Sequence, residues 1–297
     1  MLKVGLYIMG LKGLNCLKAI YDFTQESDAT SLSYVVYATD KNVANDYALE
    51  IEAFCKKHSL PLIARKDEDE NLSNCSDINF AIGWRWIIPN ENDNLIVLHD
   101  SILPKYRGFN PLVTALIEGD KEIGVTALKA NAEYDRGNIV GVKTITIAYP
   151  ITIETAIEEI SKCYDDLVID VLKNKAADTL KETVQDEAQA SYSLWRDDED
   201  YQIDWQQEGY RILNFINAVG FPYAGAVTYL DNQKIIIVKA AIAEDVLIAN
   251  RTPGKVIFMD SGIPTVVCGK GLLRVIEAID AETGKKIIFQ KFRSRFK

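Results

Sequence analysis

Hydrophobic and polar positions in the first half of the chain follow two alternating patterns. Short apolar runs at residues 2–9, 32–38, 78–83 and 95–98 predict buried strands, whereas residues 43–58 carry their apolar positions on one helical face. Strands that alternate with helices indicate βαβ units and hence a parallel sheet. We therefore expect an α/β domain in which helices cover both faces of a mainly parallel sheet.

The second half of the chain shows a different pattern. A polar, aperiodic stretch near residues 181–190 suits a linker, and the short apolar runs after residue 225 are separated by glycine, proline and Asp-Asn turns. These runs predict a small β-rich, barrel-like domain. We place the first domain at residues 1–185, the linker at 186–205 and the second domain at 206–297.

Composition and charge limit the possible partners. Apolar residues make up 48 % of the chain and charged residues 26 %, which is ordinary for a globular protein. The 43 acidic and 33 basic residues leave a net charge of −10, whereas a protein that holds a nucleic-acid backbone carries a basic surface. No apolar run reaches the ~20 residues of a membrane span, and the first residues do not resemble a signal peptide. We expect a cytoplasmic protein with no nucleic-acid partner and no membrane partner.

The five cysteines are an odd number and are widely spread along the chain. They are Cys16, Cys55, Cys75, Cys163 and Cys268, and none forms a C-x-x-C pair. We expect reduced, buried thiols and no metal site.

Only two histidines are present, so histidine chemistry has few candidates. His58 lies at the end of a predicted helix, where a polar side chain suits the helix dipole, and we interpret it as structural. His99 directly follows the apolar strand 95–98, and ligands of parallel sheets bind at the carboxyl ends of strands. Taken alone, a histidine after a strand is more often structural, but the residues that follow His99 change this interpretation.

Residues 99–111 read HDSILPKYRGFNP, and their two prolines and one glycine predict a rigid, shaped loop. The loop presents Lys105, Tyr106 and Arg107 together, a set suited to a phosphate or a carboxylate. Asp135 lies farther along, in a loop between two predicted strands and shortly before Gly137. From spacing alone, Asp135 is interpreted as an Asx turn.

Taken together, these segments resemble the folate-dependent formyltransferases. HDSILPKYRG, NPLVTALIEGDKEIGVTAL and DRGNIV match the family's histidine that opens an H-x-S-x-L-P loop and its aspartate on a D-x-G-x-I turn. The family includes methionyl-tRNA formyltransferase, glycinamide ribonucleotide formyltransferase and the sugar-nucleotide N-formyltransferases, and its catalytic domain is Rossmann-like. SLWRDDEDYQIDW and NAVGFPYAGAVTYL resemble the junction with the small C-terminal barrel, which the tRNA and sugar branches share.

The resemblance implies transfer of a formyl group from 10-formyltetrahydrofolate to an amine. It implies His99 as the general base and electrostatic partner of the tetrahedral intermediate, with Asp135 orienting the imidazole and stabilising its protonated form. The pterin is expected largely on main-chain groups of two loops, whose residues are Trp84, Trp86, Ile87, Ile88, Tyr134 and Asp135. For the two tryptophans, ordinary packing is an equally good interpretation.

The identity of the amine acceptor has to be argued separately. A tRNA needs many phosphate contacts, which the net charge disfavours, whereas a sugar nucleotide has only two phosphates. We therefore expect a nucleotide-linked amino sugar, for surface-polysaccharide or related sugar biosynthesis, with methionyl-tRNA as the alternative acceptor. In this interpretation Ser101 shapes the loop, and the indole of Trp195 stacks on a ring of the acceptor. The residues expected to bind the acceptor are Ser101, Lys105, Tyr106, Arg107, Asn110, Trp195 and Arg196.

One position departs from the family pattern. The family has an asparagine two residues before the histidine, where it donates a hydrogen bond to the formyl oxygen, and this chain has Val97 there. Loss of one such donor typically costs ~10²–10³ in rate. Val97 therefore keeps a third hypothesis open, a catalytically impaired binder of folate or nucleotide.

Overall fold

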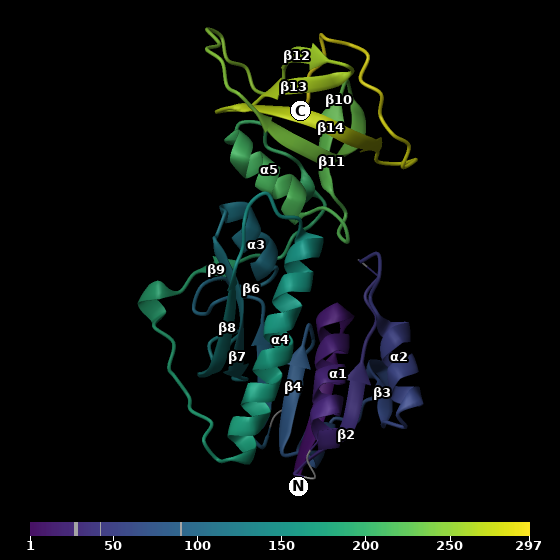
Figure 1. Ribbon diagram of the computed structural model, residues 1–297, viewed down its shortest axis with the longest axis vertical. Coiled ribbons are helices and arrows are strands. Elements are labelled where there is room, and N and C mark those ends of the chain that lie inside the picture. Colours follow the sequence, from purple (N-terminus) through teal and green to yellow (C-terminus); the bar gives the residue numbers. More distant parts are fainter. Residues whose placement is uncertain (27–28, 42, 90) are drawn as a thin grey trace. The chain divides into compact units, whose positions relative to one another are not determined.

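The computed structural model describes residues 1–26, 29–41, 43–89 and 91–297 (Figure 1). The chain divides into two compact units. The first contains Met1–Leu112, Glu122–Thr146 and Ile157–Leu194, and the second contains Val113–Lys121, Ile147–Ala156 and Trp195–Lys297. None of the helices in the described ranges is long and apolar enough to span a membrane.

The first unit is built on a seven-stranded sheet with the order β3-β2-β1-β4-β5-β7-β8. Its strands are β1 (Leu2–Ile8), β2 (Thr30–Tyr37), β3 (Leu62–Ala64), β4 (Ile78–Ile82), β5 (Leu95–His99), β7 (Glu122–Lys129) and β8 (Ile139–Thr146). The first five are parallel, and β7 and β8 add an antiparallel edge next to β5. The mainly parallel, Rossmann-like sheet predicted from the sequence is confirmed.

Different elements pack against the two faces of this sheet. Helices α1 (Gly10–Glu26), α2 (Ala48–Lys57) and α4 (Ile153–Ala176) account for the long helical segments of the first unit, and Figure 1 shows α1 beside α4. On α1, a side chain at Gly13 would lie 2.9 Å from the Cβ of Ile8, so glycine lets this helix approach β1 closely. The opposite face buries Tyr7, Tyr34 and Ile88 in one cluster, with Leu72 of the short helix η2 (Leu72–Cys75) packed against it. The face that carries the side chain of His99 is therefore covered by loops and a 3₁₀ turn, which corrects the expectation that helices cover both faces.

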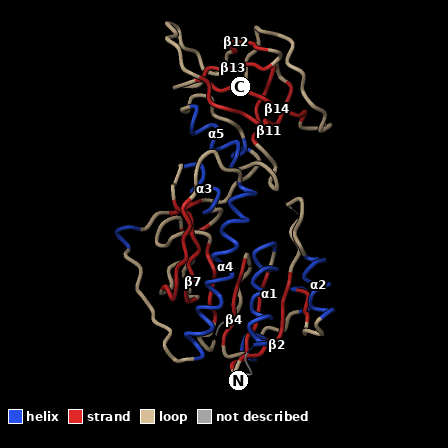
Figure 2. The backbone as a smooth tube through the Cα atoms, in the orientation of Figure 1, coloured by secondary structure: helices blue, strands red, loops and turns tan. Residues whose placement is uncertain are grey.

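After α4 the chain returns along the edge of the sheet as an irregular segment that contains the short helix η3 (Glu187–Gln189) (Figure 2). Thr183 exchanges two hydrogen bonds of 2.8 Å with Ile139 of β8. The segment then forms β9 (Tyr192–Ser193), which pairs in parallel with β6 (Arg107–Gly108). The predicted linker at 186–205 is thus divided: residues 186–194 group with the first unit and residues 195–205 with the second.

The second unit contains a five-stranded antiparallel sheet with the order β10-β11-β14-β13-β12. Its strands are β10 (Ala226–Leu230), β11 (Gln233–Ala243), β12 (Val256–Asp260), β13 (Ile263–Val267) and β14 (Leu272–Asp280). The C-terminal residues join its two edges: Lys297 exchanges hydrogen bonds of 2.9 and 3.0 Å with Tyr229, and Phe296 donates to the carbonyl of Gly254 at 2.7 Å. This closure gives the domain the barrel-like character expected from the sequence.

Two helices accompany the second sheet. α5 (Gly209–Ala218) carries Arg211, whose guanidinium holds both carboxylate oxygens of Glu118 at 2.7 and 2.8 Å. Glu118 ends α3 (Pro111–Glu118), a helix that the hydrophobic pattern did not reveal. Its signals are local, because proline stands at its first position and Gly119 follows its end with a φ of +78°.

Cysteine placement corrects one expectation. Four of the five thiols are buried, but Cys75 at the end of η2 is exposed because that 3₁₀ turn lies at the surface. All five are free. In the part of the chain that the structure describes, no group of three or more His, Cys, Asp or Glu residues could hold a metal ion.

Candidate active site

His99 is the last residue of β5 and lies at the carboxyl edge of the parallel strands. Its Nε2 lies 2.9 Å from the carbonyl oxygen of Tyr106, and its Nδ1 lies 3.5 Å from Oδ1 of Asp135. A carbonyl oxygen only accepts hydrogen bonds, so Nε2 carries a proton. Both ring nitrogens therefore face oxygen acceptors, an arrangement that accommodates an N–H on each side of the ring.

Asp135 lies on a tight turn whose neighbours are exposed. Its φ of +57° is in the left-handed region, and a side chain at Gly137 would lie 1.7 Å from the carbonyl oxygen of Lys129, so the turn requires a glycine there. The Asp135 carboxylate accepts a hydrogen bond of 2.8 Å from the backbone N–H of Gly108. The structure thus brings together His99 at the end of β5 and Asp135 on a distant turn, which spacing alone did not predict.

The segment after His99 is held by a compact set of main-chain contacts. The N–H of Ser101 donates to the carbonyl of His99 at 2.8 Å, and the hydroxyl of Thr126 donates to the carbonyl of Ser101 at 2.7 Å. The same Thr126 hydroxyl accepts from the N–H of Leu103 at 3.1 Å. The Ser101 hydroxyl is buried and has no hydrogen-bond partner among the described residues, so it is available as a donor near His99.

Asp100 anchors the same strand end to the helical face of the sheet. Its carboxylate forms an ion pair with Lys12 of α1 and accepts a hydrogen bond from Tyr164 of α4. Burial raises the pKa of this carboxyl, but the Lys12 ammonium and the Tyr164 hydroxyl outweigh burial and hold the pKa below its ordinary range. Lys12 therefore has a supporting role that the sequence did not suggest.

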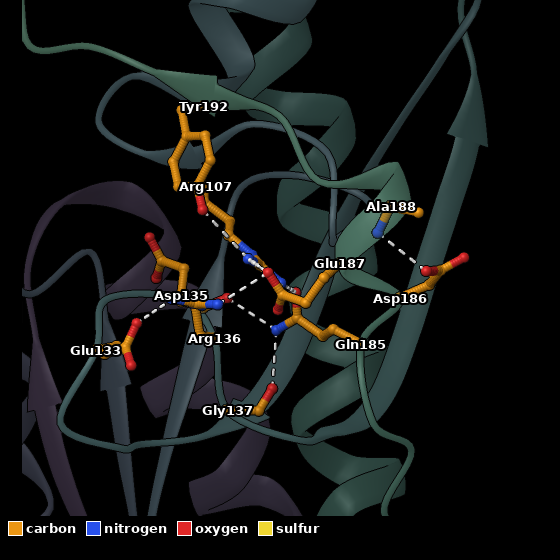
Figure 3. Close-up of polar contacts among 10 residues, drawn as sticks. All are labelled: Arg107, Glu133, Asp135, Arg136, Gly137, Gln185, Asp186, Glu187, Ala188 and Tyr192. Carbon is orange, nitrogen blue, oxygen red and sulfur yellow. Dashed lines mark hydrogen bonds and ion pairs between the residues drawn. The ribbon is translucent and has the colours of Figure 1, made fainter.

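Arg107, expected to meet a substrate phosphate, has no exposed surface. Its Nε and Nη2 donate to the side-chain oxygen of Gln185 at 3.1 and 2.8 Å, and its Nη1 and Nη2 donate to the carboxylate of Glu187 at 2.9 and 2.8 Å (Figure 3). These bonds with Arg107 lower the pKa of Glu187 to about 2. All three guanidinium nitrogens thus bind groups of this chain, and contact of Arg107 with a substrate stays a prediction.

The rest of the loop is more open. Lys105 is exposed, with its ammonium 4.6 Å above the ring of Tyr106, and Tyr106 itself is buried. Asn110 is exposed and has a φ of +49°. Lys105 is therefore the cation of this loop whose side chain reaches solvent.

The loop predicted to hold the pterin combines packed and exposed side chains. Trp84 packs edge-on against Tyr7 and Trp86, at centroid distances of 5.5 and 5.2 Å, and Ile88 is buried in the adjacent cluster. Ile87 is 83 % exposed, and Tyr134 is also largely exposed. The buried indole N–H of Trp84 has no acceptor in the described part of the chain. An aromatic surface with a spare donor fits a flat heteroaromatic ring that carries acceptors.

Val97 shares a strand face with His99, two residues closer to the start of β5. It packs against the apolar cluster that contains Tyr7 and Ala81, so it supplies no donor at the position of the family asparagine. Asn94 does not replace it, because its side chain donates to the carbonyls of Ser73 and Ser76 at 3.1 and 2.8 Å.

Trp195 and Arg196 belong to the second unit. The indole of Trp195 is 60 % exposed, and Nη1 of Arg196 donates to the carbonyl of Asp200 at 3.4 Å. Nε of Arg196 is buried without a partner among residues that the structure describes. Their contact with the acceptor stays a prediction.

Sequence reasoning missed the residues that support this site from the return segment. Gln185, Glu187 and Tyr192 contact the guanidinium of Arg107. The carbonyl of Ser191 accepts a hydrogen bond of 2.9 Å from the backbone N–H of Arg107. They lie in or beside the stretch interpreted as a linker, which has no hydrophobic period, and their partners are far away in sequence. Only tertiary contacts identify them.

Two family models match this chain. A family model described as formyl transferase matches residues 76–172, which include His99 and Asp135. A second, described as the C-terminal domain of formyl transferase, matches residues 196–297. Together the two matches cover more than half of the chain.

Solved structures share the fold. WlaRD, a sugar 3N-formyl transferase crystallised in the presence of dTDP and 5-N-formyl-THF, is 19 % identical with a TM-score of 0.67, over 92 % of this chain and 97 % of that one. The N-formyltransferase from Helicobacter canadensis, in complex with folinic acid and dTDP-3-aminofucose, is 18 % identical with a TM-score of 0.70, over 97 % and 100 %. Phosphoribosylglycinamide formyltransferase from Anaplasma phagocytophilum is 24 % identical with a TM-score of 0.52, over 64 % and 95 %. With its catalytic-domain and C-terminal-domain matches, the chain belongs to the formyl transferase family and is a formyl-transfer enzyme.

Proposed function

We propose that this enzyme transfers the formyl group of 10-formyltetrahydrofolate to the amine of a nucleotide-linked amino sugar. The observation that carries the proposal is the His99–Asp135 pair at the end of β5 in a chain that matches both formyl transferase domains. Two sugar N-formyltransferase structures align over nearly the whole chain, whereas the phosphoribosylglycinamide enzyme aligns over 64 % of it. This difference supports a two-domain formyltransferase, and the net charge of −10 favours a sugar nucleotide over a tRNA as its acceptor.

10-Formyltetrahydrofolate supplies a formyl group bound to nitrogen. In the overall transfer, the acceptor amine loses a proton and forms a bond to the formyl carbon, the bond from that carbon to N10 breaks, and N10 gains a proton. Because Nε2 of His99 already donates to the carbonyl of Tyr106, Nδ1 is the atom placed to take the amine proton. The carboxylate of Asp135, 3.5 Å from Nδ1, stabilises the imidazolium that results.

Negative charge that develops on the formyl oxygen also needs donors. Val97 offers none, so the donor role is assigned to the unpartnered hydroxyl of Ser101, and the positive charge of the His99 imidazolium stabilises the oxygen electrostatically. The pterin is assigned to the aromatic loop around Trp84, Trp86, Ile87 and Ile88 and to the turn of Tyr134 and Asp135. Lys105, with its side chain in solvent, is assigned to an acceptor phosphate.

A turnover assay tests the proposal directly. 10-Formyltetrahydrofolate is mixed with a panel of dTDP- and UDP-linked amino sugars and, separately, with methionyl-tRNA, and products are identified by mass. We expect formylation of an amino-sugar nucleotide and none of the tRNA, because the net charge of −10 disfavours a polynucleotide. Formylation of the tRNA alone would overturn the proposed acceptor. Binding of both ligand classes without turnover would instead support the impaired binder that Val97 suggests.

A further inference from the structure

The turn that carries Asp135 is largely exposed, and its internal contacts are local: the N–H of Glu133 donates to the side chain of Asn131 at 2.9 Å, and Arg136 forms an ion pair with Glu133. Residues 131–134 are exposed, and Asp135 itself is in the left-handed region of backbone space. A catalytic carboxylate must keep its position within a fraction of an ångström, because a shift of about 1 Å can cost ~10²-fold in rate. The support must therefore come from elsewhere in the chain.

Gln185 supplies that support on both sides of the turn. Its Nε2 donates to the carbonyl oxygens of Asp135 and Gly137, each at 2.8 Å. The side chain is only 6 % exposed, although it lies in the irregular segment after α4. Figure 3 shows the amide between the turn and the guanidinium of Arg107.

The orientation of this amide is fixed by chemistry. Arg107 has only donors and directs two of them to Oε1 of Gln185, while the carbonyls on the other side only accept. In a flipped amide, the NH₂ group would face the donors of Arg107, and the oxygen would face the two carbonyl oxygens of the turn. Gln185 therefore joins Arg107 to the Asp135 turn in one orientation.

The same strand end holds the other parts of the site. Gly108, next to Arg107 in β6, donates to the Asp135 carboxylate, and the carbonyl of Tyr106 accepts from His99. The ion pair between Arg107 and Glu187 balances the buried charge, so the guanidinium acts here as a support. Residues 106–108 thus contact His99 and Asp135 directly, and Arg107 reaches the Asp135 backbone through Gln185.

We propose that Gln185, anchored by Arg107, is a positioning residue that holds Asp135 against the imidazole of His99. This inference rests on the proposed function, because it assumes that the His99–Asp135 pair carries the chemistry. It assigns a functional role to a residue at the limit of the predicted linker. Gln185 does not touch the reacting atoms and acts only through Asp135.

The test is Gln185→Glu, which keeps size and an acceptor for Arg107 but places an acceptor against the two carbonyls of the turn. We expect kcat to fall ~10–100-fold, while KM for the folate and for the acceptor stays nearly unchanged. Gln189→Glu is the matched control, since it adds the same charge at an exposed position whose amide donates to Asp186. We expect this control to behave as wild type.

A spectroscopic readout separates positioning from general damage and needs no substrate. The chain has two histidines, so ring resonances from His99 and His58 can be assigned by substitution. At one fixed pH, Gln185→Glu should move the His99 resonances and leave those of His58 in place, in a protein that still unfolds cooperatively.

Three outcomes are distinguishable. Wild-type kcat and unmoved His99 resonances in Gln185→Glu would overturn the positioning role. Equal loss in Gln185→Glu and Gln189→Glu would do the same, because charge alone would explain it. If His99→Ala and Asp135→Asn keep wild-type turnover, the assignment of the chemistry to this pair fails, whatever Gln185→Glu does, whereas a wild-type enzyme that formylates no amino-sugar nucleotide would refute the proposed function itself.

Discussion

The two histidines of this chain occupy contrasting surroundings within one unit. His58 follows α2, and its ring packs against Tyr21 and Phe54 with centroid distances of 4.3 and 4.5 Å. His99 ends β5, and its ring nitrogens face a backbone carbonyl and a carboxylate. Aromatic faces hold a ring in place without exchanging protons, whereas oxygen acceptors prepare it for proton transfer. Surroundings rather than residue type therefore separate the histidine that we interpret as structural from the one to which we assign the chemistry.

The largest test of this contrast is alanine at each histidine. His99→Ala removes the proton acceptor and should lower kcat ~10³-fold, within the range for general acid–base groups. His58→Ala removes only ring packing, so kcat should stay near wild type. Steady-state kinetics at saturating substrates measures both. Near wild-type transfer by His99→Ala would remove His99 from the mechanism.

A second test concerns the ion pair beside His99. Lys12→Met leaves the Asp100 carboxylate buried without its cation and should reduce the free energy of unfolding by about 3 kcal/mol. In wild type the pKa of Asp100 is lowered, so its stabilisation is present above the ordinary carboxyl range and is lost as pH falls through the folded-state pKa.

The pH dependence provides the control for Lys12→Met. Without the ammonium, burial favours the protonated carboxyl, so the loss of stability in the variant should be greatest near neutral pH and shrink in acid. Urea denaturation across pH measures this. A loss independent of pH would show that Lys12 acts by packing.

A third test adds a hydrogen-bond donor to the strand face that carries His99. Val97→Asn places an amide two residues before His99, where the family carries its donor to the formyl oxygen. We expect kcat to rise about tenfold, a part of the ~10²–10³ that such donors supply. Val97→Thr, which is closer than asparagine to the shape of valine, is the variant matched to Val97→Asn. An unchanged kcat in a well-folded Val97→Asn would indicate that Ser101 and His99 already meet this need.

The smallest expected effect lies in the second unit. Arg196→Ala should raise KM for the amine acceptor several-fold and leave KM for the folate nearly unchanged, because one charge-assisted hydrogen bond is lost. Arg211→Ala, which removes an ion pair with Glu118 in the same unit, is the comparison variant. Equal effects on both substrates would assign Arg196 a structural role, and no effect would remove it from acceptor binding.

Much of the fold could be predicted from local patterns. The strand that ends at His99 is a continuous apolar run, and the antiparallel strands of the second unit are separated by turn residues, so period and turn chemistry sufficed. Helix α3 was missed despite the signals at Pro111 and Gly119, because its short apolar stretch has no clear polar face. Closure of the barrel by Phe296 and Lys297 could not be predicted, since it pairs the chain end with distant strands.

The sequence by itself determined which groups are available: one histidine at a strand end, an aspartate on a glycine-containing turn and a valine where a donor is expected. Only the tertiary structure decided how they are arranged. It turned Arg107 inward onto Gln185 and Glu187, and it made the Gln185 amide a support for Asp135. The reason is physical. Hydrophobic period and turn propensity are properties of neighbouring residues, whereas a hydrogen bond between buried groups depends on segments that meet only after folding.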